Sequence, residues 1–129
     1  MKRRRLLAAA PLLLVPAAPA AWGCGVCVED KVAATYDYAV LQRAAAAGHL
    51  VVYCGIDGPA DAARLRAAAA RVGGIDRGSV RVAAEPAAVS FALDPAQQSP
   101  QAAAAALQRA LPGRLRIAVL RVADPAAGR

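Results

Sequence analysis

Residues 50–59 read LVVYCGIDGP, a short apolar segment that ends in a turn and leads into a helix. Alternating apolar side chains, β-branched residues and flanking glycines over residues 50–56 predict a strand. The segment GIDG at 55–58 has the composition of a turn, and Pro59 suits the first turn of a helix. We therefore expect a helix over residues 60–72, ended by Gly73 and Gly74.

Strands and helices continue to alternate downstream. Residues 79–83 and 88–93 have period-two apolar patterns, and the Glu85-Pro86 connection between them predicts a hairpin. Ser99 and Pro100 are typical of an N-cap and a first helical residue, which predicts a helix over residues 101–111. Residues 115–122 form the last expected strand. The order β-α-β-β-α-β predicts an α+β, ferredoxin-like sandwich, with a four-stranded antiparallel sheet and two helices on one face.

One extra N-terminal helix is expected before this unit, over residues 29–47. Its apolar residues recur at spacings of three, four and seven and form a single stripe. Glu29 and Asp30 suit the positive end of the helix dipole, and Gly48 suits the C-terminal end. On this helix we expect Tyr36 in the core and Tyr38 at the surface. The stripe is apolar enough that the helix must pack against the rest of the domain.

The first twenty residues have the composition of a secretory signal peptide. Residues 2–5 are KRRR, residues 6–15 are apolar apart from Pro11, and Ala18-Pro19-Ala20 is a small-x-small cleavage site. The apolar run of about ten residues is short of the roughly 20 needed to span a bilayer, so we expect no stable membrane span. The sequence predicts cleavage after Ala20 and export to the periplasm or the medium.

The charge of the chain depends on this cleavage. The whole chain carries +7, but loss of residues 2–5 leaves 12 Lys and Arg against 9 Asp and Glu, a net charge of +3. This charge is small and scattered, and aromatic residues are few, so the sequence argues against nucleic-acid binding. A lipid anchor at Cys24 is disfavoured, because bulky Trp22 stands two residues before it and no Leu or Val precedes in the usual place.

Residues 50–122 resemble the heavy-metal-associated domain family of copper chaperones and metal-transporting ATPases. The segments VGGI at 72–75, GSVRV at 78–82 and AVSFALDP at 88–95 carry the resemblance, with Ser99 and Leu107 at family-like spacing. The resemblance implies the same ferredoxin-like fold. In that family a Gly-Met-x-Cys-x-x-Cys loop between the first strand and first helix holds the metal ion. Here Gly58 and Asp61 stand where the two cysteines would be, so metal ligation does not carry over to these positions.

Cys24 and Cys27 form a displaced C-x-x-C motif immediately before the extra helix. The positive end of a helix lowers thiol pKa, and the thiolate is both nucleophile and metal ligand. Copper(I), zinc and mercury prefer such soft ligands. We therefore expect a soft metal ion such as Cu(I) or Zn(II) at Cys24 and Cys27, with Cys54 and His49 as possible additional ligands. Cys54 shares a strand face with apolar residues, which also suits a buried core thiol.

Two alternatives remain open for the C-x-x-C pair: thiol-disulfide redox chemistry, or a structural disulfide in a non-catalytic interaction module. Catalytic motifs of hydrolases and nucleotide enzymes are missing from the sequence, so we expect no enzyme apart from possible thiol chemistry. The expected partner is a metal-donor or metal-acceptor protein. The predicted organisation is a signal peptide at 1–20, the C-x-x-C segment and helix at 21–48, the ferredoxin-like domain at 49–123 and a flexible tail at 124–129.

Overall fold

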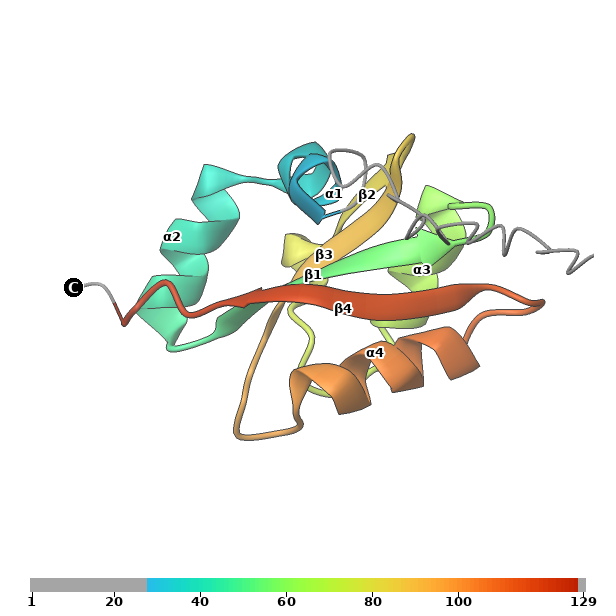
Figure 1. The fold of residues 1–129 in the computed structure, drawn as a ribbon. Coiled ribbons are helices and arrows are strands. Elements are labelled where there is room, and N and C mark those ends of the chain that lie inside the picture. Colours follow the sequence, from blue (N-terminus) through green and yellow to red (C-terminus); the bar gives the residue numbers. More distant parts are fainter. Residues whose placement is uncertain (1–27, 128–129) are drawn as a thin grey trace, which may run out of the picture.

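The computed structural model describes residues 28–127. The expected signal peptide, its cleavage after Ala20, and Cys24 and Cys27 lie outside the described residues. The described chain folds as one sheet with helices on both faces (Figure 1). Its elements, in chain order, are α1 (Val28–Thr35), α2 (Tyr38–Ala47), β1 (Leu50–Asp57), α3 (Ala62–Ala69), the short 3-10 helix η2 (Arg77–Ser79), β2 (Arg81–Ala84), β3 (Ala87–Leu93), α4 (Pro100–Arg109) and β4 (Arg116–Ala123).

The four strands form one antiparallel sheet in the order β2-β3-β1-β4. β1 is therefore an inner strand, with Val52 opposite Phe91 of β3, and Cys54 opposite Val119 of β4. A β-bulge interrupts the pairing of β1 with β4 between Tyr53 and Cys54. Together with the helices α3 and α4, this order confirms the predicted ferredoxin-like α+β fold.

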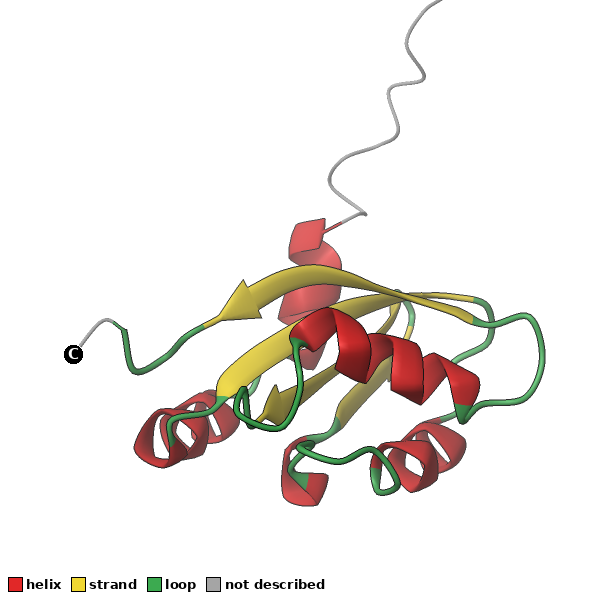
Figure 2. Cartoon of the chain, turned by 90° about the horizontal axis from the view of Figure 1, so that it is seen from below, coloured by secondary structure: helices red, strands yellow, loops and turns green. Residues whose placement is uncertain are grey.

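The main core lies between the sheet and the pair α3 and α4, which cover one face (Figure 2). From β1 this face carries Val52, Cys54 and Ile56, all buried. Leu65 of α3 and Leu107 of α4 pack against them, and neither is more than 1% exposed. The apolar period of two in residues 50–56 thus corresponds to a real buried face.

The opposite face of the sheet is covered by α1 and α2. Val40 and Ala44 of α2 pack on Val51 and Tyr53 of β1 in a second, smaller core. β1 is consequently buried on both faces, from Val51 to Ile56. The apolar stripe upstream of the domain therefore packs against the sheet, as its composition requires.

The prediction of one continuous helix over residues 29–47 is wrong, because the chain breaks between Thr35 and Tyr38. Asp37 has extended backbone (φ −142°, ψ 114°), and its Oδ1 accepts hydrogen bonds from the N–H groups of Ala39 (2.9 Å) and Val40 (3.3 Å). Asp37 is thus the N-cap of a new helix, a role for which Asp is strongly preferred. The break also turns Tyr36 to the surface, where it is 54% exposed, so its predicted core position is wrong as well.

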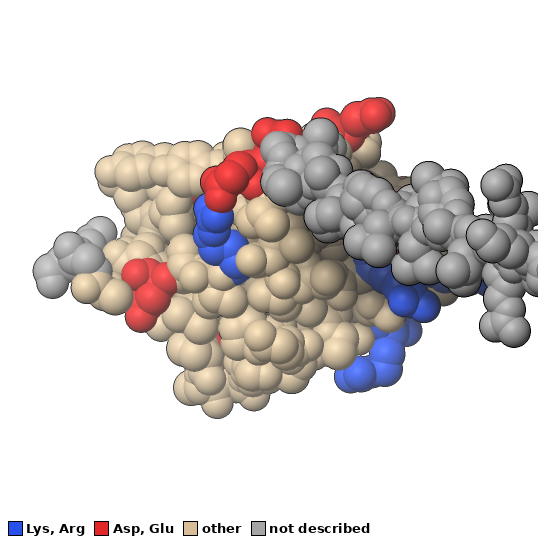
Figure 3. Space-filling view, viewed as in Figure 1, with Lys and Arg blue, Asp and Glu red and all other residues tan. Residues whose placement is uncertain are grey.

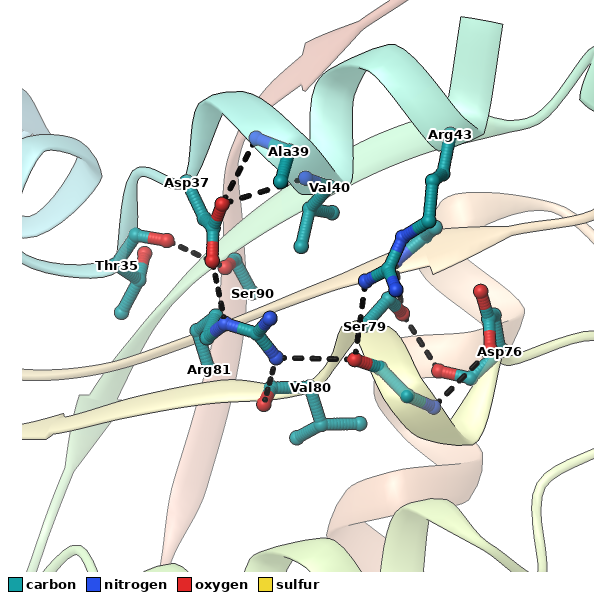
Figure 4. Close-up of polar contacts among 12 residues, drawn as sticks. Thr35, Asp37, Ala39, Val40, Arg43, Asp76, Ser79, Val80, Arg81 and Ser90 are labelled. Atoms are coloured by element: carbon teal, nitrogen blue, oxygen red, sulfur yellow. Dashed lines mark hydrogen bonds and ion pairs between the residues drawn. The ribbon is translucent and has the colours of Figure 1, made fainter. Parts of the chain in front are cut away.

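Polar contacts hold the break between α1 and α2 against the sheet (Figure 4). Arg81 of β2 donates from Nε to Asp37 Oδ2 at 2.9 Å, and its other contacts are the carbonyl oxygens of Gly78 and Val80. Buried Ser90 of β3 donates from its hydroxyl to the Thr35 carbonyl at 3.1 Å. The Asp37 carboxylate therefore caps the N-terminus of α2 and also attaches this helix to the sheet.

At the other end of the chain, residues 124–127 form a turn in which Asp124 accepts hydrogen bonds from the N–H groups of Ala126 and Ala127. Pro125 lies beside Tyr36 and Tyr38. Tyr38 is 63% exposed, at the surface as predicted. Among residues 28–127, no helix is long and apolar enough to cross a membrane.

Truncation of the core should unfold this domain more readily. Phe91 is fully buried between the sheet and α3 and α4, so Phe91→Ala should lower the free energy of unfolding by about 3–5 kcal/mol. Exposed Tyr38 is the matched control, and Tyr38→Ala should change the free energy of unfolding by less than about 0.5 kcal/mol. Urea denaturation followed by circular dichroism measures both, and equal effects would contradict the described core.

Asp37 should make the domain sensitive to acid. The hydrogen bond from Arg81, aided by the backbone N–H groups, holds the pKa of Asp37 below its ordinary value of 3.8. A depressed carboxyl pKa contributes stability above the unfolded value and loses it as pH falls through the folded value. The stabilisation is therefore complete above the unfolded pKa, begins to fall as the pH drops toward about 4, and is lost only as the pH falls through the lower pKa of the folded protein.

Asp37→Asn keeps a capping oxygen but loses the ion pair with Arg81. The melting temperature of this variant should therefore fall less between pH 5 and pH 3 than that of the parent protein. Asp37→Ala also removes the cap and should lower the melting temperature at neutral pH. Exposed Asp30→Asn serves as the control and should leave the pH profile unchanged. If the melting temperatures of Asp37→Asn and the parent protein fall equally between pH 5 and pH 3, the ion pair with Arg81 does not contribute to the acid sensitivity.

Candidate functional site

Gly58 follows β1 at the first position where the resembling family has a cysteine, and its geometry does not suit one. Its φ is +128°, in a region that L side chains rarely adopt. A Cβ at this position would lie 2.9 Å from Leu115 Cδ1, closer than side-chain contacts allow. A thiol at residue 58 would therefore require both the turn and Leu115 to move.

Asp61, at the second such position, begins α3. Its Oδ1 accepts hydrogen bonds from the N–H groups of Ala63 (3.1 Å) and Arg64 (3.2 Å), which makes it the helix N-cap. Its other oxygen lies 3.6 Å from Arg64 Nε. Gly58 and Asp61 thus have backbone roles that a cysteine would not fulfil, in agreement with the sequence interpretation that no metal ligands carry over here.

A cleft of about 500 Å³ lies beside this loop, between the start of α3 and the connection from α4 to β4. Leu65, Leu111 and Leu115 line its apolar part. Its charged groups are two carboxylates and two guanidinium groups, from Asp57, Asp61, Arg64 and Arg114. Among residues 28–127, its lining contains no thiol or imidazole and so offers no soft donors for copper(I) or mercury.

Cys54 lies in the main core and is 1% exposed. Burial raises the pKa of its thiol to about 12, because the apolar surroundings disfavour the thiolate. Its side chain belongs to the α3 and α4 face of the sheet, whereas α1, which follows Cys27 in sequence, packs on the other face. Cys54 therefore does not serve as an additional ligand for a site near α1, and the expectation that it might join the metal site is withdrawn.

His49 stands between α2 and the first residue of β1, and it is half-buried. Its backbone N–H donates to the carbonyl of Ala44 at 2.8 Å, which closes the end of α2. β1 separates it from Gly58 by roughly 25 Å, given the rise of a strand. Cys54 and His49 are thus not brought together with the loop at Gly58. Within residues 28–127, no group of three or more His, Cys, Asp or Glu side chains is arranged to hold a metal ion.

The start of α1, one residue after Cys27, is attached to β4. Glu29 accepts hydrogen bonds from both terminal nitrogens of Arg121, in a bidentate pair. This contact lowers the pKa of Glu29 and raises the pKa of Arg121. The first turn of α1 is therefore fixed to the edge strand of the sheet, and the charge of Glu29 is balanced.

Lys31 lies on the sheet side of α1, over Gly55 of β1. Its Nζ is 3.2 Å from the place where a Cβ on Gly55 would lie, and Leu120 Cδ1 is 3.1 Å from the same point. The absence of a side chain at Gly55 is what lets the Lys31 stem lie flat against β1. Sequence reasoning assigned no role to Lys31 or Arg121, because their contacts join residues far apart in the chain and leave no local pattern.

Comparison with known proteins finds similarity among solved structures. No family model matches the sequence, and no curated protein matches it. Among solved structures the chain is similar to a copper binding domain from HMA7, a P-type ATPase, with 18% identity and a TM-score of 0.48. The match covers 57% of this chain and 96% of that chain. At this identity, no residue role passes from that domain to this chain.

The burial of Cys54 can be tested with a thiol reagent. In a Cys24→Ser/Cys27→Ser variant, Cys54 is the only cysteine left, and its raised pKa of about 12 keeps it protonated at pH 8. Ellman's reagent should therefore fail to modify the native variant over the time in which it modifies the same variant in guanidinium chloride. Rapid modification of the native protein would contradict the described position of Cys54.

Proposed function

We propose that this is an exported, non-enzymatic protein of the heavy-metal-associated type that binds a soft metal ion through Cys24 and Cys27. The ion is Cu(I) or Zn(II), and the protein carries it for handling or delivery outside the cytoplasm. The observation that carries the proposal is the position of the C-x-x-C motif, which ends one residue before the docked helix α1. Two thiolates at this spacing can chelate one soft ion.

The described surroundings of α1 support a thiolate at this position. The N-terminal end of a helix carries partial positive charge, which favours an anion close to it. Glu29 would oppose such an anion, but its charge is balanced by Arg121. Lys31 is four residues after Cys27, one helical turn on, and adds a positive charge on the same helix. The helix end and Lys31 favour the deprotonated thiols that a soft metal requires, whereas Asp30, three residues after Cys27, opposes them.

The rest of the described domain supports the same assignment by elimination. The loop at Gly58 and Asp61 has lost the family's thiols, and both residues now have backbone roles. Cys54 is buried in the core. Of the chain's three cysteines, the pair Cys24 and Cys27 is therefore the remaining candidate for chelation. A partner that donates or accepts the ion by ligand exchange would have to approach the side of the sheet covered by α1.

A metal titration tests the proposal. The reduced protein, beginning at Ala21, is titrated anaerobically with Cu(I) in the presence of a chromogenic Cu(I) chelator, and separately with Zn(II). We expect one ion per chain. Cys24→Ser/Cys27→Ser should weaken the affinity about a hundredfold or more, because both soft ligands are lost. Cys54→Ala is the matched control and should retain the affinity of the parent protein.

Three results would contradict this function. Equal, weak uptake by the parent protein and the double serine variant would remove the C-x-x-C pair as a metal site. A reduction potential of the pair below about −300 mV, with no metal uptake after reduction, would identify a structural disulfide. A higher potential with disulfide exchange toward a substrate protein, again without metal uptake, would identify redox chemistry instead.

A further inference from the structure

The sheet has two edges, and they differ in length and in protection. β2 has four residues, and its Arg81 binds Asp37, the N-cap of α2, and the Gly78 carbonyl of η2. β4 has eight residues, Arg116–Ala123, with the sequence RIAVLRVA. An exposed apolar edge strand is a template for pairing with another extended chain, which proteins otherwise block with charges or bulges. Only the C-terminal half of β4 has a bulge, at Leu120, so residues 116–119 form a regular edge.

One contact shows which backbone groups of β4 point outward. The Ile117 N–H donates to Gln108 Oε1 of α4 at 2.8 Å, away from β1. Because the N–H and C=O groups of a strand alternate in direction, those of Val119, two residues on, also point to the open edge. The Gln108 side chain therefore accepts the hydrogen bond that the carbonyl of a neighbouring strand would accept from Ile117. The next outward N–H and C=O groups along this edge are those of Val119.

A groove runs beside this edge, between α4 and β4, with a volume of about 370 Å³. Ala104 and Ala105 of α4 and Ile117 and Val119 of β4 form its apolar lining. An extended segment paired with the edge would place every second side chain in this groove. The small alanine side chains on α4 leave room for residues such as Val.

The other side chains of such a segment would lie on the opposite face, beside Arg116 of β4. Arg116 lies opposite Asp57 in the sheet register, on the α1 and α2 face, where Arg121 is already paired with Glu29. Arg109 and Arg114 add positive charge at the connection from α4 to β4, and Figure 3 shows Lys and Arg side chains at that end of the molecule. This edge would repel a second copy of itself and attract acidic side chains.

We propose that β4 is a docking edge for an extended protein segment in which acidic and apolar residues alternate. The segment adds a fifth strand antiparallel to residues 116–119, its apolar side chains enter the groove at α4, and its carboxylates lie beside Arg116. The backbone of Val119 anchors it. The proposal rests on residues of α4 and β4, without Cys24 or Cys27, and goes beyond the proposed function.

A charge-reversal experiment with two peptides tests the docking edge. A fluorescein-labelled, end-capped heptapeptide of alternating Glu and Val is titrated with the purified protein and followed by fluorescence anisotropy, beside a matched Lys and Val peptide. We expect the Glu peptide to bind and the Lys peptide not to bind. Arg116→Glu should weaken the binding of the Glu peptide by at least about fivefold and strengthen the binding of the Lys peptide. Arg77→Glu, before β2 at the other edge, is the control and should change neither.

The backbone contact is tested separately. Val119→Pro removes an outward N–H, so it should abolish binding while circular dichroism shows an unchanged fold. Amide shifts in the ¹⁵N spectrum should be confined to β4, α4 and the connection between them. If Val119→Pro unfolds the protein, the change in peptide preference caused by Arg116→Glu still tests the proposal. Equal binding of both peptides, or equal effects of Arg116→Glu and Arg77→Glu, would overturn the proposal.

Discussion

The burial of β1 on both faces is the constraint on which the rest of the structure depends. From Val51 to Ile56 each residue of this strand is buried, so it needs helices on both sides of the sheet. The βαββαβ unit supplies α3 and α4 for one face only. The N-terminal helices α1 and α2 supply the other, where Val51 and Tyr53 pack on α2. The segment before the domain is therefore part of the fold.

This second layer determines what the region around α1 can do. A helix that covers a sheet face is held in position by several contacts, and α1 has one at each end, the Glu29 pair with Arg121 and the Thr35 carbonyl at Ser90. The C-x-x-C motif precedes the first of these contacts directly. By contrast, the loop after β1 has a glycine at φ +128° and a capping aspartate. The proposed metal site therefore precedes a helix that the sheet holds in place.

Much of the fold could be predicted because its signals are local. Alternation over residues 50–56, Ser99 before Pro100 and the apolar pair of strands around Glu85 all lie within a few residues of the structure they specify. The break at Asp37 was also locally coded, since Asp is a preferred N-cap, but the apolar spacing across it suggested one helix. The surface position of Tyr36 follows from that break. The resemblance of residues 50–122 to heavy-metal-associated domains implied the same ferredoxin-like fold, which the structure has.

By itself, the sequence determined the order of strands and helices, the modest charge of the chain after residue 20 and the thiols available for chemistry, because composition and short-range periodicity encode these. Only the tertiary structure decided which face α1 and α2 cover, that Cys54 is sealed in the core and that His49 lies at the far end of β1 from Gly58. These depend on contacts between residues distant in sequence, such as Asp37 with Arg81 and Glu29 with Arg121. The pairing partner of a charged side chain across such a separation is chosen by packing, and the local pattern of residues does not contain it.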